Sequence, residues 1–391
     1  MKLRDEIEAV LRSWDAYEAE RGSAAVIDFD CAPTAVPVEP AAGRLAVYRR
    51  LDDLRARAVE AGADRLTARL TADLAYLGAL LGEYRPLGDY VRATQGCGAA
   101  GWPDGYVAYR GERARQALDA VGVGWGPETV RELRAVEGPI EIGEAPGAIR
   151  QAAGDAEAAV RRATGSRAPF RLTIETAEVD AYWAYWLDGA GERVRLRLNL
   201  CRANFTEVAA RQFALHEVLG HGLQSASWTA RAAAEDVPWV RLMSVHAPQQ
   251  VLLEGLAQAL PLFVAPEDEL LVARTRFDHY NQLVRAELHL ALGRGADVAE
   301  VAEHARVRMP WTTEAAVADL LTDRGADPQL RSYLWAYPAG IDWFVNLAEA
   351  GEGVATTVLR AAYRDPLTPA DLAALWPEGP AIGGQGASSV R

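Results

Sequence analysis

Residues 214–225 read ALHEVLGHGLQS and contain two of the six histidines of the chain. His216 and His221 are five residues apart, and Glu217 directly follows the first of them. On a regular α-helix five residues turn through about 500°, so the two imidazoles would point about 140° apart. Two side chains in that arrangement do not share one metal ion. The stretch therefore predicts a metal site only if the helix departs from regular geometry here.

A one-residue bulge in the helix removes this conflict. A local turn closed by i-to-i+5 hydrogen bonds absorbs the extra residue and returns His221 to the face of His216. Gly220 precedes His221 and Gly222 follows it, and glycine lowers the steric cost of an irregular turn. Such bulges are frequent at functional sites. We predict a helix over this stretch, with a bulge that brings both histidines to one side.

A catalytic zinc site has three protein ligands and one open position, so a third ligand must come from elsewhere. Residues 249–263, QQVLLEGLAQALPLF, form an apolar helical pattern with a single acid, Glu254. A lone carboxylate among leucines is costly to bury unless it is paired or binds a metal. We expect His216, His221 and Glu254 to bind one Zn²⁺ ion, although other divalent transition metals suit the same ligands. Glu217 is then left to act as general base on the attacking water.

Each of these residues also has an ordinary structural interpretation. Two histidines on a helix are usually exposed or satisfied in a core, and a lone buried glutamate often pairs with an arginine. The combination of His-Glu, a glycine-flanked second histidine and a buried downstream glutamate favours the metal site.

A hydrolase of this kind also needs a donor for the developing oxyanion. Tyr337 precedes a proline in YLWAYPAG (residues 333–340), and a helix break there would aim it inward. We take Tyr337 as the catalytic candidate, with a buried aromatic core residue as its alternative role. The other candidates for this role are Tyr333, His279, Tyr280 and Arg285. His246, between the two ligand segments, is expected in a loop.

Helical periodicity dominates the rest of the chain. The one clear change is at residues 170–200, where apolar and polar residues alternate around the turn DGAGE at 188–192. We expect a mostly α-helical fold with a small β-hairpin or sheet beside the active-site helix. Arg193, Arg195 and Arg197 are expected on a solvated strand face. Helices are predicted over residues 3–21, 44–61, 64–81, 105–121, 127–135 and 148–164, and again between about 206 and 375.

These patterns divide the chain into three parts. Residues 1–165 are expected to form a helical N-terminal lobe. Residues 166–378 are expected to form the zinc-binding catalytic lobe, with the small sheet and helices. Residues 379–391 have the composition of a flexible tail.

Composition excludes several functional classes. The net charge of the 391-residue chain is −13, which argues against a nucleic-acid-binding surface. Lys2 is the only lysine, which excludes Schiff-base and P-loop lysine chemistry in the body of the chain. Three widely spaced cysteines and the absence of a long apolar run predict a cytoplasmic protein without a membrane span. The oligomeric state is not indicated.

The motif resembles those of two known families. HEVLGHG (residues 216–222) resembles the H-E-x-x-G-H motif of the dipeptidyl peptidase III family, which also spaces its histidines by five. The second half of the chain is similar to the bacterial domain-of-unknown-function 885 family, predicted metallopeptidases of the gluzincin type. That family reads H-E-x-x-P-G-H-H-L-Q and later E-G-W-A. The matching residues are His216, Glu217, Gly220, His221, Leu223, Gln224, Glu254, Gly255 and Ala257.

The resemblance implies a gluzincin-like helical metalloenzyme that hydrolyses an amide or peptide bond in a small peptide or peptide-like metabolite. The family's proline before the glycine is missing, and Leu292 and Ala296 stand near the places of its later Asp and His. These departures motivate an alternative, a metal-dependent enzyme of specialised metabolism that carries out hydrolysis, elimination or isomerisation of a small metabolite. A structural zinc in a binding protein is a third reading, and it requires a fourth protein ligand.

Overall fold

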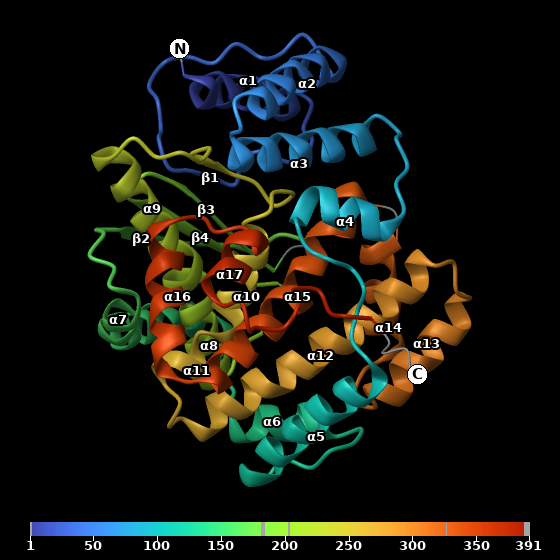
Figure 1. The fold of residues 1–391 in the computed structure, drawn as a ribbon. Coiled ribbons are helices and arrows are strands. Elements are labelled where there is room, and N and C mark those ends of the chain that lie inside the picture. Colours follow the sequence, from blue (N-terminus) through green and yellow to red (C-terminus); the bar gives the residue numbers. More distant parts are fainter. Residues whose placement is uncertain (1, 181–183, 202–203, 326, 387–391) are drawn as a thin grey trace.

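The computed structural model describes residues 2–180, 184–201, 204–325 and 327–386, and these are mostly helical (Figure 1). The helices before the sheet follow the predicted periodicity because each buries one apolar stripe, as α1 does with Ile7, Leu11 and Trp14. They are α1 (Leu3–Glu20), α2 (Arg44–Glu60), α3 (Asp64–Leu80), α4 (Leu87–Gln95), α5 (Asp104–Ala120), α6 (Thr129–Val136), the 3₁₀ turn η1 (Ile142–Glu144) and α7 (Ala145–Thr164).

Helices resume after the sheet, as the sequence predicted. They are α8 (Glu207–Phe213), the π-helical segment η2 (Ala214–Gly222), α9 (Leu223–Ala234), α10 (Gln250–Ala259), α11 (Pro261–Val264), α12 (Glu269–Gly293), α13 (Val298–Arg308), α14 (Glu314–Gly325), α15 (Pro328–Ala350), α16 (Glu352–Arg364) and α17 (Pro369–Leu375). No helix in the described ranges has both the length and the apolar character needed to cross a membrane.

A small mixed sheet lies beside the π-helical segment η2. Its strands are β1 (Phe29–Asp30), β2 (Arg171–Ala177), β3 (Tyr185–Ala190), β4 (Arg193–Asn199) and β5 (Leu242–Met243), in the order β2-β4-β3-β1-β5. The predicted hairpin is confirmed, because β3 and β4 pair antiparallel across the DGAGE turn. Strands β1 and β5, which the sequence did not predict, extend the sheet at one edge.

The two faces of β4 differ as expected. Val194, Leu196 and Leu198 are buried against the helices. On the other face Arg195 and Arg197 both pair with Asp188 of β3, at 2.8 Å. The interpretation of the arginines as a solvated face is therefore confirmed for this pair.

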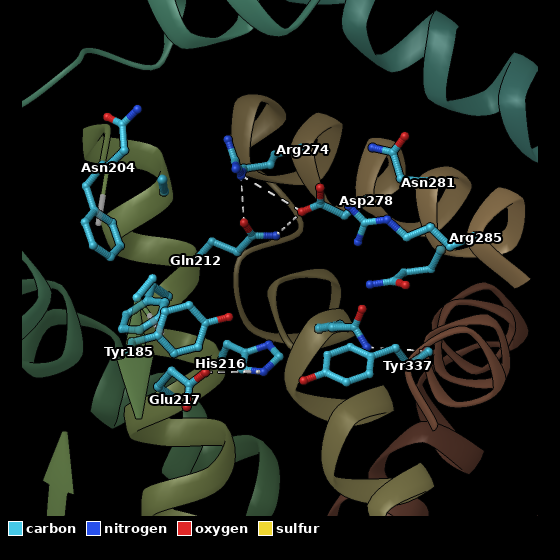
Figure 2. Close-up of a pocket in the computed structure, with 16 residues that line it drawn as sticks. Tyr185, Asn204, Gln212, His216, Glu217, Arg274, Asp278, Asn281, Arg285 and Tyr337 are labelled. Carbon is cyan, nitrogen blue, oxygen red and sulfur yellow. Dashed lines mark hydrogen bonds and ion pairs between the residues drawn. The ribbon is translucent and has the colours of Figure 1, made fainter. Parts of the chain in front are cut away.

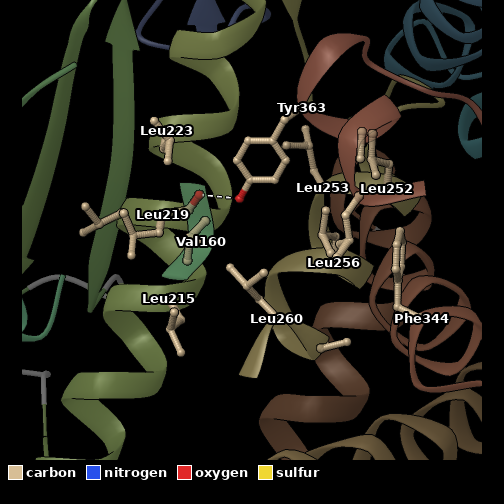
Figure 3. Close-up of a cluster of buried hydrophobic side chains, with 14 of the residues drawn as sticks. Val160, Leu215, Leu219, Leu223, Leu252, Leu253, Leu256, Leu260, Phe344 and Tyr363 are labelled. Atoms are coloured by element: carbon tan, nitrogen blue, oxygen red, sulfur yellow. Dashed lines mark hydrogen bonds between the residues drawn. The ribbon is translucent and has the colours of Figure 1, made fainter. Parts of the chain in front are cut away.

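The largest apolar cluster surrounds the predicted metal-binding helix (Figure 3). Leu215, Leu219 and Leu223 form a stripe that faces leucines of α10. The same cluster includes Ile149 and Val160 of α7, so it contains residues from both sides of position 165. The hydroxyl of Tyr363, from α16, donates a 2.6 Å hydrogen bond to the Leu219 carbonyl oxygen.

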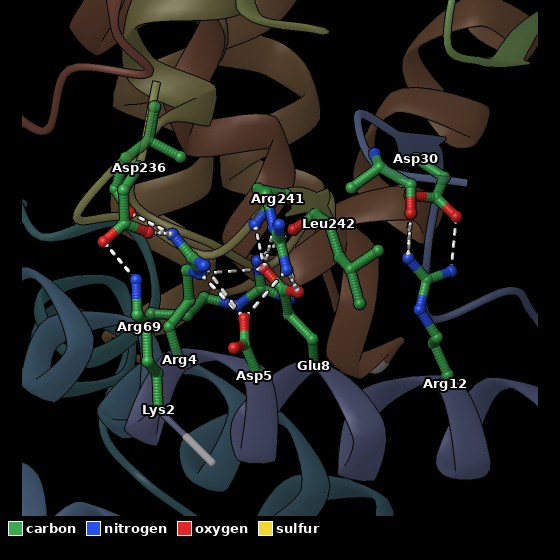
Figure 4. A network of polar contacts seen from close by, with 12 residues as sticks. Lys2, Arg4, Asp5, Glu8, Arg12, Asp30, Arg69, Asp236, Arg241 and Leu242 are labelled. Carbon is green, nitrogen blue, oxygen red and sulfur yellow. Dashed lines mark hydrogen bonds and ion pairs between the residues drawn. The ribbon is translucent and has the colours of Figure 1, made fainter. Parts of the chain in front are cut away.

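Helix α1 is tied by ion pairs to the segment that leads into α10 (Figure 4). Arg4 lies 2.9 Å from Asp236, and Nε of Arg241 donates a 2.9 Å hydrogen bond to Glu8. Arg12 pairs with Asp30 at the end of β1. The first helix therefore fixes one edge of the sheet and the entry to α10.

Part of the predicted flexible tail is held in place. Gly383 accepts a 3.0 Å hydrogen bond from the Gly101 amide, and the Gly386 amide donates one of 3.0 Å to Gly101. Glycines allow this part of the predicted flexible tail to lie directly against the backbone of another loop. Residues 387–391 lie outside the described part.

Candidate metal centre

The stretch that carries both histidines is π-helical over its whole length. Segment η2 spans the nine residues Ala214–Gly222 and continues directly into α9. In a π-helix the hydrogen bonds close from i to i+5, which brings residues five apart to one side. The Nε2 atoms of His216 and His221 lie 3.1 Å apart, with their rings perpendicular. The predicted bulge is confirmed, and it covers more of the helix than one residue.

Gly220 is needed here for close packing. Its φ is not positive, and a Cβ at this position would lie 2.8 Å from Cβ of Ala257 on α10. A Cβ on Gly222 would lie 2.9 Å from a methyl group of Val194 on β4. A Cβ on Gly220 would also lie 2.9 Å from the Leu215 carbonyl oxygen of the same π-turn, so the prediction that Gly220 lowers the steric cost of the irregular turn is confirmed. Both glycines let α10 and β4 approach the π-helical backbone.

Glu254 of α10 faces both histidines. Its carboxylate oxygens lie 3.5 Å from Nε2 of His216 and 3.7 Å from Nε2 of His221. Glu254 is only 2% exposed, and its Oε2 atom has no hydrogen-bond partner among the described residues. Because buried polar atoms are almost always satisfied, an unpartnered carboxylate oxygen beside two imidazoles is the feature that a bound cation would explain.

Helix α15 supplies two tyrosines to the same point. The Tyr333 hydroxyl donates a 2.5 Å hydrogen bond to Oε1 of Glu254 and lies 2.9 Å from the Tyr337 hydroxyl. The predicted helix break at Pro338 is wrong, since α15 continues through it to Ala350. Tyr337 reaches the site because residues four apart share one face of a helix, and Tyr333 already faces Glu254.

Glycines again explain how α10 and α15 come together. A Cβ on Gly255 would lie 2.4 Å from the backbone of Gly340, and a Cβ on Gly340 would lie 2.3 Å from the Val251 carbonyl oxygen. The two helices therefore cross in backbone contact at the residue after Glu254. This contact sets the position of Glu254 relative to Tyr333.

Glu217 lies beside His216 in a buried position. It is 6% exposed, and its Oε1 atom is 3.7 Å from Nε2 of His216. Burial raises the pKa of Glu217 to about 7, and the negative charge of Glu254 acts in the same direction. A carboxyl group with a pKa near neutrality is suited to accept and return a proton.

Two cavities meet at this cluster. One, of about 430 Å³, is lined by His216, Glu217 and Tyr337 together with residues of α12 (Figure 2). The other, of about 500 Å³, is lined by His221, Glu254 and Tyr333. Glu217, Tyr337 and Tyr185 line both cavities. A substrate-sized molecule has room on either side of the histidines.

The donor atoms fit a single zinc ion. With Zn–N and Zn–O bonds of about 2.0–2.2 Å in tetrahedral geometry, neighbouring ligand atoms are about 3.3 Å apart. Nε2 of His216 lies 3.1 Å from Nε2 of His221 and 3.5 Å from Oε2 of Glu254, and the 3.7 Å contact of His221 is to the other oxygen, Oε1. Glu217 also lies close enough to both histidines to complete such a group. Glu254 is the better third ligand, because its oxygens lie close to both Nε2 atoms and one of them is otherwise unpartnered.

Three other candidates lie outside this centre. His279 is bonded to Asp342 at 2.9 Å, and the Tyr280 hydroxyl donates to the Arg308 carbonyl oxygen. His246 is buried, with Nε2 2.9 Å from Asp73 and its ring stacked on Tyr76. These three residues stabilise the fold at their own positions, and His246 is fixed by packing on α3. Arg285, in contrast, lines the smaller cavity.

Sequence reasoning missed Tyr185 and Asn281, which also line that cavity. Tyr185 is the first residue of β3, and no local pattern distinguishes it from the other aromatic residues of its segment. Asn281 continues the polar stripe of Asp278, Gln282 and Arg285 on α12, so helical spacing could have found it.

Comparison with known proteins adds information on the fold alone. No family model matches the chain, and no curated protein matches it. A solved structure described as "the putative lipoprotein from Colwellia psychrerythraea" is similar, with a TM-score of 0.57 and 14% sequence identity. The match covers 85% of this chain and 60% of that protein, so the present chain spans less than two thirds of its length. At this identity the likeness concerns the arrangement of helices and strands.

Proposed function

We propose that this chain is a metal-dependent hydrolase that cleaves an amide bond in a small peptide or peptide-like metabolite. One observation carries the proposal: Nε2 of His216 lies 3.1 Å from Nε2 of His221 and 3.5 Å from Oε2 of Glu254, a buried carboxylate oxygen without a hydrogen-bond partner among the described residues. Neutral imidazoles and carboxylates at these distances are the donor set that Zn²⁺ prefers. His216, His221 and Glu254 would hold the ion.

Residues of the chain account for the proton transfers. When bound, Zn²⁺ supplies polarisation of the scissile carbonyl and acidification of the attacking water. Glu217 accepts one proton from the water as its oxygen bonds to the carbonyl carbon. Glu217 then returns that proton to the nitrogen as the C–N bond breaks, which yields an acid and an amine. The Tyr337 hydroxyl, from the lining of the same cavity, would donate to the developing oxyanion.

The surroundings of the cluster favour a catalytic site over a structural one. A structural zinc needs four protein ligands and no open position. Glu217 is the nearest further donor, and it lines both cavities, as do Tyr337 and Tyr185. Access from two cavities is typical of a site that exchanges substrate and product.

The cellular location is part of the same proposal. Cys31, Cys97 and Cys201 are all free thiols, which favours a reducing compartment such as the cytoplasm. The lipoprotein description belongs to the structural neighbour, and an extracytoplasmic location of the present chain is the alternative.

The hydrolysis rate of a variant at Glu217 tests the proposed mechanism. We expect the zinc-loaded protein to cleave members of a short-peptide library. Glu217→Gln should keep its metal and lose at least about 10²–10⁴-fold in rate, the usual contribution of a general base. Glu300→Gln, the same change at an exposed position of α13, should leave the rate unchanged. Full activity of Glu217→Gln would contradict the mechanism. Turnover of small metabolites without any peptide cleavage would favour the non-peptidase alternative.

A further inference from the structure

Three polar side chains of α12 form part of the wall of the smaller cavity, which His216 also lines. Asn281, Gln282 and Arg285 all come from α12 and all line the 430 Å³ cavity (Figure 2). Asn281 is 8% exposed and Gln282 is 9% exposed. In the part of the chain that the structure describes, none of the three makes a hydrogen bond or an ion pair with another side chain or with the backbone. Buried amides without partners are uncommon, so this wall requires an explanation.

Arg285 is the most costly of the three to leave unpaired. Its Nε atom is buried without a partner among the described residues, and burial lowers the pKa of its guanidinium. The nearest acid on the same helix face, Asp278, already accepts a 2.8 Å hydrogen bond from Gln212. The charge of Asp278, which lines the same cavity, acts on Arg285, but the two form no ion pair within the described chain. A buried guanidinium without a directly bonded carboxylate is unfavourable.

A second cation close by makes the local imbalance larger. Arg324 of α14 is 7% exposed and makes no ion pair with any described residue. Burial and the charge of Arg285 together lower the pKa of Arg324 to about 9, against the opposing effect of Asp323. This is an excess of positive charge inside a protein whose net charge is −13.

Other arginines around this cavity are compensated. Arg274 of α12 also lines the cavity. It lies 2.6 Å from Glu137 and 2.7 Å from Gln212. Arg110 of α5, which does not line this cavity, lies 2.8 Å from Glu349. Of Arg274 and Arg285, the two arginines in the described lining of this cavity, Arg285 is therefore the one without an ion pair.

We propose that Arg285, Asn281 and Gln282 form a subsite for a carboxylate group of the substrate. This inference rests on the proposed function and specifies its substrate class: a short peptide or N-acyl amino acid with a free carboxylate. The guanidinium presents a planar pair of donors that matches a carboxylate, and the two neutral amides add hydrogen bonds without adding charge. One cation and two amides suit a monoanion.

The position of the subsite fits this substrate. The cavity that Arg285 lines also contains His216, Glu217 and Tyr337, so one molecule can contact both groups. Its volume of about 430 Å³ is that of a small-molecule site. The carboxylate would anchor the substrate while its amide bond lies beside Glu217.

Matched acid and amide probes test the subsite. The probes are N-benzoyl-glycyl amino acids with several side chains, each as the free acid and as the C-terminal amide. We expect the zinc-loaded protein to hydrolyse the acids with a kcat/KM about 100-fold higher than the amides. Arg285→Gln should lower kcat/KM for the acids by about 100-fold, the usual cost of truncating a buried charge pair, and leave the amides unchanged. Arg276→Gln, whose side chain pairs with Glu349, is the control on the same helix.

A binding measurement separates this inference from the hydrolysis itself. Calorimetric titration of the Glu217→Gln protein should show acids binding at least about 30-fold more tightly than amides, and Arg285→Gln in that background should remove the difference. If the wild type binds the acids through Arg285 and yet hydrolyses none of them, that result would support the subsite and contradict the proposed hydrolysis. Equal affinity for acids and amides, or no binding of any acid, would overturn the subsite.

Discussion

Glu217 and Glu254 lie close to the same imidazole, yet their surroundings favour opposite charge states. Burial raises the pKa of both carboxyl groups, and for Glu217 it prevails and brings the value to about 7. For Glu254 the charges of His221 and His216 and the Tyr333 hydroxyl outweigh burial and hold the pKa below its ordinary value. Two carboxylates whose environments separate their pKa values usually divide the ligand and acid–base roles. This division agrees with the assignment of Glu254 as ligand and Glu217 as base.

A substitution at Tyr333 tests whether its hydroxyl orients the proposed metal ligand Glu254. Its hydroxyl donates to Oε1 of Glu254, so Tyr333→Phe should weaken metal affinity by about 10–100-fold, as loss of a group that orients a ligand usually does. At saturating metal, kcat should change little. Tyr337→Phe is the matched comparison, because it should keep the metal affinity and lower kcat by about 10²-fold or more. Competition with a chelator gives the affinities, and equal affinities for the two variants would argue against the role of Tyr333.

The buried side chain of His289 should make the free energy of unfolding depend on pH. It is 1% exposed, and its Nε2 atom has no partner among the described residues. Burial lowers the pKa of His289 to about 3, and the charges of Arg324 and Arg331 act in the same direction. Between pH 6.5 and 3 the unfolded chain therefore binds a proton at this residue that the folded chain does not. The free energy of unfolding should fall by about 2 kcal/mol from this residue alone as the pH drops from 7 to 5.

Urea unfolding at pH 7 and pH 5 measures this contribution. His289→Leu should reduce the loss of stability between the two pH values by about 2 kcal/mol. His304→Leu, at an exposed histidine of α13, is the matched control. If His289→Leu shows the same pH dependence as the wild type, His289 is not buried in its neutral form.

At the scale of elements, three helices meet through small residues. Gly220 of η2 faces Ala257 of α10, and Gly255 of α10 faces Gly340 of α15. The sequence segments LGHG, EGLA and PAG therefore supply both the functional side chains and the space that brings them together. The glycines beside the ligands allow close packing of the helices, and Gly220 also avoids a clash with the Leu215 carbonyl oxygen inside the π-turn.

The contact between α10 and α15 can be tested at Gly255. A Cβ there would lie 2.4 Å from the Gly340 backbone, which cannot move away as a side chain can. Gly255→Ala should lower the free energy of unfolding by about 1–3 kcal/mol and also weaken metal binding. Gly154→Ala is the control, since nothing lies within 4 Å of a Cβ at that position of α7. It should stabilise the protein by about 0.5–1 kcal/mol. If Gly255→Ala leaves both the free energy of unfolding and metal binding unchanged, α10 and α15 are not in backbone contact.

The sequence predicted elements well where the evidence was local. The amphipathic helices, the β3–β4 hairpin and the bulge between His216 and His221 all follow from spacing within one segment. Strands β1 and β5 did not, because each is two residues long and exists only through pairing with a distant strand. Pro338 was misjudged for a related reason: helix packing on both sides of α15 outweighs the local cost of a proline.

Site residues were likewise predictable where the evidence was local, and not where it depended on tertiary structure. His216, His221 and Glu217 share one motif, and Glu254 was visible as a single acid in an apolar helix. Tyr333 was one of several candidates, and nothing in the sequence showed that its hydroxyl reaches Glu254. Tyr185 enters from the sheet, so only the tertiary arrangement places it beside Glu217.

At the scale of the whole molecule, the N-terminal helices support the metal-binding half. Arg69 and Asp73 of α3 bond to Ser244 and His246, in the segment just before α10. Helix α1 holds the same segment through Glu8 and Arg241. The division into lobes at residue 165 remains a prediction, but the entry to α10 depends on contacts from both sides of it. The position of Glu254 on α10 therefore also depends on contacts made by α1 and α3.

The most direct test of the account is the metal content of the purified protein. Elemental analysis after dialysis against zinc should give one ion per chain for the wild type and for Glu217→Gln. His216→Ala, His221→Ala and Glu254→Ala should each contain almost none, because two remaining ligands do not hold the ion. Circular dichroism would confirm that the variants are folded. A wild type without metal would contradict the central claim, and a fully loaded Glu254→Ala would remove Glu254 from the ligand set.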